Sequence, residues 1–449
     1  MKNTKNFASR WGFILASVGS AVGMANVWGF PNKLGSNGGG AFLLIYLLFI
    51  FIFSYVGLPA EFAMGRHAAT GTLGAYEKAW STRGKGAGKA GGLLGWLPLA
   101  GSLCIAFGYA VIVTYILKAL VDSLVGTLMT ADTASWFGTF SSTPYSVIPY
   151  HIIVVVGTLL TLYLGAHSIE KTNKIMMPLF FIIFLILAVR VAMLPGVSEG
   201  YRFMFTPRWE ALKDPMIWIW AMGQAFFSLS VTGSGMIVYG AYLSKDEDVV
   251  GVAQHTALFD TIAAVVAALV IIPACFSYGV APDNGPSLLF VTLPQVFVNM
   301  AGGRFWGTLF FLFMMFASMS TVLAVFENIL AICMDTFGWS RKKAVFINGV
   351  LLMLLSLPCV FGYNIWSDFH PILGKDVLDS EDFLVSNLLL PIGSLVYLLF
   401  CVTKWGWGFD KYIAEVNKGA GVKLSPKLKP YFQWVLPILI VIILLQGLL

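Results

Sequence analysis

The chain has 449 residues, of which 58% are hydrophobic and only 11% are charged. Soluble domains carry roughly 25% charged residues, so this composition excludes an ordinary soluble enzyme and predicts a polytopic membrane protein. The net charge of +6 does not indicate nucleic-acid binding, because the basic residues gather between apolar stretches. The five cysteines lie in or beside apolar stretches, and we interpret them as small hydrophobic residues.

A membrane-spanning helix needs about 20 mainly apolar residues. Eleven segments meet this criterion, and they predict an all-α protein with one transmembrane domain over residues 1–449. The segments lie near residues 11–34, 41–66, 92–120, 149–166, 172–195, 215–243, 251–279, 303–337, 342–363, 383–403 and 431–448.

Basic residues alternate between successive loops. The amino-terminal tail contains Lys2, Lys5 and Arg10, whereas residues 121–148 contain neither lysine nor arginine. The loop near residues 196–214 is the one exception to this alternation. Because basic loops favour the cytoplasmic side, we expect a multi-pass protein of the cell's inner (plasma) membrane, with its amino terminus in the cytoplasm and its carboxyl terminus outside.

The first and sixth segments are rich in glycine and hydroxyl side chains, with the sequences GSAVGMANVWGFP and SLSVTGSG. For either stretch alone, close packing of helices through small residues is an equally good explanation. Two such stretches, five spans apart, favour an inverted-repeat transporter with broken helices. We expect repeats over approximately residues 8–195 and 210–403, with an additional helix over residues 431–448.

The stretches AVGMANVWGFP, NGGGAFLLIYL and GLPAEFAMGRH resemble the first two helices of the neurotransmitter:sodium symporter family. GQAFFSLSVTGSG followed by SKDED is similar to its sixth helix, and FASMSTVLAVFE to its eighth. The resemblance runs from about residue 7 to the last span. It implies a LeuT-type 5+5 inverted repeat with helices 1 and 6 broken, plus an eleventh helix. It also implies sodium-coupled symport of an amino acid by alternating access.

The resemblance implies two sodium ions and no organic cofactor. Broken helices suit these ions, because unwound carbonyls can coordinate a cation. The first sodium site would combine the substrate carboxylate with Ala21, Asn26, Ser228 and Asp260. The second site would use the carbonyls of Gly19, Val22 and Ala317 and the hydroxyls of Ser320 and Thr321.

Each of these sites has a plainer interpretation. An intramembrane acid such as Asp260 can be a neutral carboxyl group hydrogen-bonded in a packed interface, although it points by default to function. Serine and threonine in a membrane helix commonly bond back to their own backbone. Relatives often have asparagine at the position of Asp260, and chloride-dependent relatives need an anion near this site. A permanent charge at Asp260 therefore predicts chloride-independent transport.

The substrate prediction depends on Gly23, where relatives that carry monoamines have an aspartate. Without that acid the solute must bring its own carboxylate, which selects α-amino acids. By resemblance, the amides of Gly23 and Met24 and the hydroxyl of Tyr109 would bind the carboxylate, and Ala21, Phe227, Ser228 and Ser320 would bind the amine. The mainly apolar side-chain pocket would suit a neutral hydrophobic or aromatic substrate, enlarged where Gly233 replaces a bulkier residue. Its lining would be Ile105, Tyr109, Phe227, Ser230, Gly233, Thr321 and Val325.

Several gating positions depart from the family pattern. Gly29 replaces an arginine, so the outer ion pair with Asp382 cannot form in the usual way: either another group closes the gate, or Asp382 is a solvated acid. Phe7 replaces a tryptophan, and the usual nearby arginine is missing, which leaves Lys2 or Lys5 as partners for Asp335. Ser168 replaces the glycine ten residues before Pro178, where the fifth helix would unwind. Tyr242, beside the SKDED loop, is expected to brace the inner gate.

Two alternatives to sodium symport remain open. Asp260 would carry a proton in a proton-coupled transporter, and a transporter-like sensor would bind an amino acid without moving it. An enzyme is not expected, because the five histidines have no metal-type spacing and none lies in the predicted site. The expected partners are an amino acid, sodium ions and the lipid bilayer, without nucleic acid, and a monomer is expected to suffice for transport.

Overall fold

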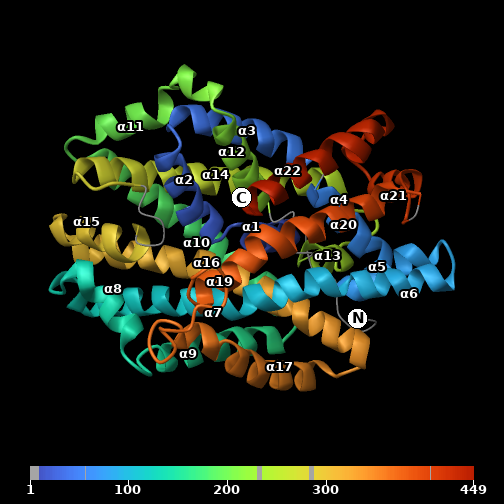
Figure 1. The fold of residues 1–449 in the computed structure, drawn as a ribbon, viewed down its shortest axis with the longest axis horizontal. Coiled ribbons are helices and arrows are strands. Elements are labelled where there is room, and N and C mark those ends of the chain that lie inside the picture. Colours follow the sequence, from blue (N-terminus) through green and yellow to red (C-terminus); the bar gives the residue numbers. More distant parts are fainter. Residues whose placement is uncertain (1–9, 56, 230–234, 283–287, 405, 449) are drawn as a thin grey trace.

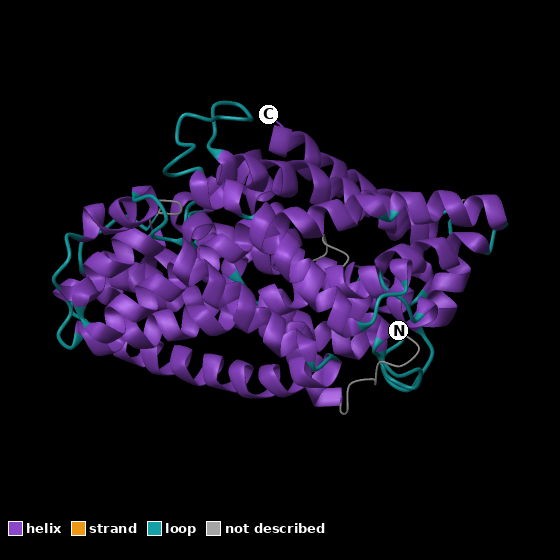
Figure 2. Cartoon of the chain, turned by 90° about the horizontal axis from the view of Figure 1, so that it is seen from below, coloured by secondary structure: helices purple, strands orange, loops and turns teal. Residues whose placement is uncertain are grey.

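A computed structural model describes residues 10–55, 57–229, 235–282, 288–404 and 406–448. These residues form a layered bundle of helices and contain no β-strand (Figures 1 and 2). Helices occupy all eleven of the apolar segments, so the predicted all-α architecture is confirmed. Within the described residues, seven helices are long and apolar enough to cross a membrane, and a bent pair near the amino terminus makes an eighth candidate.

The first five segments contain seven α-helices and one π-helical segment, η1. In chain order these elements are α1 (Arg10–Ala21), η1 (Ala25–Gly29), α2 (Phe30–Ser36), α3 (Gly40–Ser54), α4 (Gly57–Ala68), α7 (Trp96–Val125), α9 (Ile148–Tyr163) and α10 (Ala166–Ala192).

The remaining six segments follow the same pattern. They contain α12 (Pro215–Ser228), α13 (Gly235–Ala241), α14 (Val249–Ser277), α16 (Gly303–Phe337), α17 (Arg341–Leu355), α18 (Leu357–Phe361), α19 (Val377–Phe383), η5 (Leu384–Leu389), α20 (Leu390–Val402), η7 (Tyr431–Val435) and α22 (Leu436–Leu448).

Shorter helices fill the connections at both ends of the bundle. At the end near the amino terminus lie α5 (Thr72–Ser81), α6 (Lys85–Leu94) and α21 (Phe409–Val416), and at the opposite end lie α8 (Thr133–Ser142), α11 (Val197–Phe205) and α15 (Leu293–Asn299) (Figure 1). A criterion of about 20 apolar residues does not detect helices of this length.

The first span is broken where the glycine-rich sequence predicts it. Helix α1 ends at Ala21, Val22 and Gly23 are not helical, and the chain continues into η1 and α2 at an angle of 55°. The sixth span is described as two helices, α12 and α13. Residues 230–234, between these two helices, lie outside the described residues. This range includes the predicted pocket residues Ser230 and Gly233.

An ion-pair cluster fastens the end of α4 to α21. Arg66 Nε lies 3.0 Å from Glu415 Oε1, and their side chains are only 1% and 5% exposed. Desolvation would raise the pKa of Glu415, but hydrogen bonds from His67 and Lys418 and the charge of Arg66 outweigh it and lower the pKa to about 2. Glu415 therefore stays ionised, which a buried arginine requires.

Small residues allow α4 and α13 to pack backbone against backbone. A β-carbon on Gly65 would lie 1.9 Å from the carbonyl oxygen of Ile237, and one on Gly240 would lie 2.5 Å from that of Phe62. Such contacts are typical of helix pairs in membranes, where close approach replaces the hydrophobic driving force. They hold α13, in the sixth span, against α4, in the second span.

This contact predicts that Gly65→Ala destabilises the protein by about 1–3 kcal/mol, because the added methyl group has no space between two backbones. The measurement is the unfolding temperature of the purified protein in detergent. Gly157→Ala in α9 is the matched control, since nothing lies within 4 Å of its β-carbon position. Equal unfolding temperatures for the two variants would contradict the packing described.

Candidate functional site

Three polar side chains from distant parts of the sequence meet beside the break in the first span. Asn26 Nδ2 donates to Ser228 Oγ at 3.0 Å and to Asp260 Oδ1 at 2.7 Å, and Ser228 Oγ donates to Asp260 Oδ2 at 2.6 Å. Asn26 lies in η1, Ser228 is the last residue of α12, and Asp260 is in α14. All three are 0% exposed, so the described residues enclose them completely.

Two further polar residues join this cluster, and the sequence analysis missed both. Tyr46 in α3 donates its hydroxyl to Ser228 Oγ at 3.0 Å. Gln224, one turn before Ser228 in α12, donates to the carbonyl of Ala25 at 2.7 Å. Gln224 carried a signal, as an amide inside an apolar segment, whereas nothing in the sequence around Tyr46 distinguishes it from a packing residue.

The cluster has the chemistry of a site for a hard cation. Hydroxyl and carboxylate oxygens meet there, and Asn26 turns its NH₂ group toward them, because the Gly23 N–H donates to Asn26 Oδ1 at 3.1 Å and fixes the orientation of that amide. The backbone of Ala21 ends α1 immediately before this turn. Oxygen ligands of this kind suit alkali and alkaline-earth cations.

The residues of the second predicted cation site lie where α1 meets α16. Thr321 Oγ1 donates to the carbonyl of Val22 at 3.2 Å, across the two helices. The hydroxyls of Ser320 and Thr321 also lie 2.8 and 3.4 Å from the carbonyl of Ala317. A β-carbon on Gly19 would lie 3.1 Å from Ser320 Cβ. Back-bonding therefore accounts for Ser320 by itself, whereas Thr321 also binds the unwound backbone.

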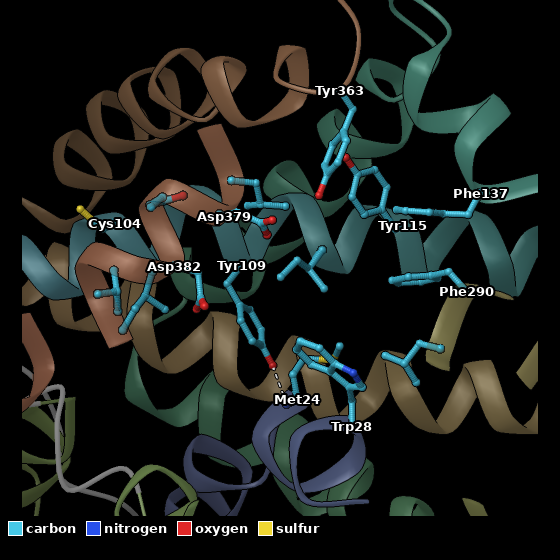
Figure 3. A pocket seen from close by; sticks show the side chains of 17 residues that line it. Met24, Trp28, Cys104, Tyr109, Tyr115, Phe137, Phe290, Tyr363, Asp379 and Asp382 are labelled. Carbon is cyan, nitrogen blue, oxygen red and sulfur yellow. Dashed lines mark hydrogen bonds between the residues drawn. The ribbon is translucent and has the colours of Figure 1, made fainter. Parts of the chain in front are cut away.

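The predicted carboxylate-binding groups lie together at the same break. Tyr109 extends from α7 toward the turn, and its hydroxyl accepts a hydrogen bond of 3.1 Å from the Met24 N–H (Figure 3). A β-carbon on Gly23 would lie 2.7 Å from Thr321 Oγ1 and 3.0 Å from the Tyr109 hydroxyl oxygen. This turn therefore has no room for an acidic side chain at position 23 unless its neighbours move.

A cavity of about 360 Å³ opens above Tyr109 and Met24 (Figure 3). Its walls are mainly apolar, with Tyr115, Phe137, Phe290 and Tyr363 grouped on one side. The acids Asp379, Glu381 and Asp382 line it as well. Volumes of 300–1,000 Å³ are usual for small-molecule sites.

The cavity includes only part of the predicted pocket. Of those residues, Ile105 and Tyr109 line it, together with Met24 from the predicted carboxylate-binding group. Phe227 in α12 and Thr321 and Val325 in α16 are not among its lining residues.

A lysine, Lys33 in α2, lies one turn beyond Gly29. The Lys33 ammonium is 5.6 Å from the ring centre of Trp220 and 5.8 Å from that of Phe227. Its charge interacts with that of Asp382, whose Oδ1 accepts a hydrogen bond of 3.0 Å from Ser386. A cation is therefore present in this region although residue 29 is glycine.

Two of the residues predicted for the inner gate, Asp335 and Tyr242, have well-defined partners. Asp335 Oδ2 accepts a 2.6 Å hydrogen bond from the Gly71 N–H, and the Tyr242 hydroxyl donates to Glu327 Oε1 at 2.6 Å. Arg10, which the sequence analysis did not consider as a gate residue, lies 3.8 Å from Glu247. Phe7, Lys2 and Lys5 lie outside the described residues.

The fifth span is one helix in this structure. Ser168 is in the first turn of α10 and Pro178 lies inside it, without a break between them. Ser168, which stands where the family pattern has a glycine, is helical in this conformation.

Comparisons with known proteins agree with this geometry. The family model described as the sodium:neurotransmitter symporter family matches residues 4–144 and 139–449. An uncharacterized sodium-dependent transporter of Bacillus subtilis is 33% identical over 98% of this chain and 97% of its own. A second, from Haemophilus influenzae, is 29% identical over 100% and 99% of the two chains.

Among solved structures, the crystal structure of MhsT in complex with L-phenylalanine has a TM-score of 0.87 and 35% sequence identity. The match covers 99% of each chain. It confirms the LeuT-type fold expected from the sequence.

Proposed function

We propose that this chain, which belongs to the sodium:neurotransmitter symporter family, imports neutral hydrophobic or aromatic L-amino acids by sodium-coupled, chloride-independent symport. The family and its sodium-dependent relatives make it a multi-pass membrane transporter that uses sodium. The observation that carries the finer proposal is the buried Asn26–Ser228–Asp260 cluster beside Gly23.

The first sodium ion would bind among these three side chains and the carbonyl of Ala21. A carboxylate without contact to water is strongly destabilised unless a cation or several hydrogen bonds compensate it. Asp260 receives hydrogen bonds from Asn26 and Ser228, and a sodium ion would neutralise its charge. The substrate carboxylate would complete the coordination, which couples the solute to the ion.

The second sodium ion would bind between the α1 break and α16. Its ligands would be the carbonyls of Gly19, Val22 and Ala317 with the hydroxyls of Ser320 and Thr321. The contact between Thr321 and Val22 supports this, because a hydroxyl already bonded to an unwound carbonyl lies within reach of the same cation. Two ions without an organic cofactor would then drive transport.

The substrate would bind through its carboxylate to the Gly23 and Met24 amides and to Tyr109. The Met24 N–H donates to the Tyr109 hydroxyl, and the substrate carboxylate would replace this hydrogen bond with one to each group. The amine would face carbonyls near Ala21, Phe227 and Ser228 and the hydroxyl of Ser320. The apolar walls and aromatic rings of the cavity favour a neutral, hydrophobic side chain. MhsT, with a similar fold, is solved in complex with L-phenylalanine.

The two inverted repeats would span approximately residues 8–195 and 210–403, followed by the extra helix. The amino terminus would lie in the cytoplasm and the carboxyl terminus outside, in the inner (plasma) membrane. A monomer would suffice, because every proposed ligand comes from one chain. A sensor would bind the amino acid without transporting it, and a proton-coupled transporter would not depend on sodium. The following experiment separates both from the proposed symporter.

The test is uptake of radiolabelled leucine, phenylalanine and tryptophan into proteoliposomes, driven by sodium or potassium gradients, with and without chloride. We expect accumulation that needs sodium and is the same in gluconate as in chloride. Asp260→Asn should reduce uptake in gluconate at least about tenfold, since it removes roughly the interaction of one charge, and chloride should partly restore it.

Asp122→Asn is the control for that variant, because Asp122 is a buried acid on α7 that pairs with Lys118 at 2.7 Å, away from the cluster. Amino-acid binding without uptake would favour the sensor. Uptake that follows a pH gradient and ignores sodium would favour proton coupling.

The outer gate would close through Lys33 and Asp382 in place of the missing arginine. We expect Lys33→Met to slow uptake several-fold while amino-acid binding at equilibrium changes little, since the pair acts on closure and lies outside the ligand set. Exchanging the charges, with Lys33→Asp and Asp382→Lys together, should recover uptake relative to either single variant. Unchanged uptake by Lys33→Met would show that Asp382 is a solvated acid.

A further inference from the structure

Asn173, in the fifth span, is a buried polar residue to which the proposed function gives no role. It lies in α10, which packs against both α1 and α16, the two helices of the second cation site. Its side chain is 0% exposed. Polar groups buried in this way normally have partners, and an exception requires a physical explanation.

One end of the Asn173 amide is satisfied and the other is not. Asn173 Nδ2 donates to the carbonyl of Ile169 at 3.0 Å. Only the NH₂ group can donate to a carbonyl, so this bond fixes which end of the amide is oxygen. The remaining atom, Oδ1, accepts no hydrogen bond from any of the described residues.

This oxygen is directed at the backbone of α1 next to the second site. A β-carbon on Gly19 would lie 2.3 Å from Asn173 Oδ1 and 3.1 Å from Ser320 Cβ. Glycine at position 19 thus allows the amide oxygen to touch α1 at a residue whose carbonyl is itself a proposed sodium ligand. Asn173 Oδ1 and Ser320 therefore approach the same face of Gly19.

We propose that Asn173 Oδ1 is a further oxygen ligand for the sodium ion of the second site. Amide oxygens are hard ligands like the carbonyls and hydroxyls already present. A cation also accounts for an oxygen that is held in place and has no donor. The inference rests on the proposed function, since it presupposes a sodium ion between α1 and α16.

The position of Asn173 in α10 links this ligand to bending of the helix. Pro178, five residues later, has no N–H, so α10 lacks one hydrogen bond in the turn that follows Asn173. Bending of α10 at that turn would move Asn173 relative to Gly19. The amide oxygen would then change its distance from the ion as the transporter changes state.

The test is a sodium titration of the purified protein in detergent without amino acid. The unfolding temperature is measured at each sodium concentration. Omitting the amino acid emphasises the second site, because the first is completed by the substrate carboxylate. Asn173→Ala should raise the half-saturating sodium concentration about tenfold, which corresponds to about 1.4 kcal/mol. Asn173→Asp, which keeps an oxygen and adds a charge, should leave this concentration at or below that of the unmutated protein.

Asn348→Ala is the matched control. Asn348 is also buried and donates back to a carbonyl four residues earlier, that of Ala344 at 2.8 Å, but it lies in α17. Its variant should titrate like the unmutated protein. Opposite effects of alanine and aspartate at position 173 would support a ligand, because a packing role predicts that both weaken the protein.

Two results would overturn the inference alone: equal titrations for Asn173→Ala and Asn348→Ala, or equal weakening by alanine and aspartate at position 173. Absence of any sodium response in the unmutated protein would contradict the proposed function, and the inference with it.

Discussion

A carboxylate enclosed in the middle of a membrane protein is the constraint on which the rest of the site depends. Asp260 has no contact with solvent, and two side chains from other helices donate hydrogen bonds to it. Neutral donors compensate a buried charge only in part, so a cation is the natural complement. The end of α1 at Ala21 fits the proposed cation site, because a continuous helix would leave its carbonyls bonded internally.

The surrounding helices hold that arrangement through close contacts. Gly65 and Gly240 bring α4 and α13 together at backbone distance, and the cluster around Arg66 and Glu415 fastens the end of α4. These contacts keep α13 in place, while α12 brings Ser228 to Asn26 and Asp260. Lys33 lies against the rings of Trp220 and Phe227, which links α2 to α12.

Much of the fold follows from apolar length and composition. The eighth span, α16, begins and ends at the residues predicted from hydropathy, and the first helix breaks at Gly23 as its glycine content indicates. Apolar length did not predict the short helices α5, α8 and α21, because a half-buried helix in a connection needs only two or three turns. Helix α10 is continuous through Ser168 and Pro178, since one proline weakens a helix without necessarily breaking it.

The site was less accessible to sequence reasoning. Asn26 and Asp260 are 234 residues apart, and only the family resemblance placed them together. The sequences around Tyr46 and Asn173 resemble ordinary membrane helix, so the contacts of these two side chains depend on helix rotation and register. The sequence analysis considered Gly29 but not Lys33, whose position against Trp220 and Phe227 follows only from the fold.

The central claim is that the substrate carboxylate completes a sodium site, and the most direct measurement compares an amino acid with its decarboxylated amine. Binding of radioactive sodium to the purified protein would be measured with phenylalanine, with phenethylamine and with neither. Coupled ligands change each other's affinity, typically by about 5–150-fold. We expect phenylalanine to raise sodium affinity within that range and phenethylamine to have no effect. An equal increase with both compounds would show that the carboxylate is not a sodium ligand and would contradict this account.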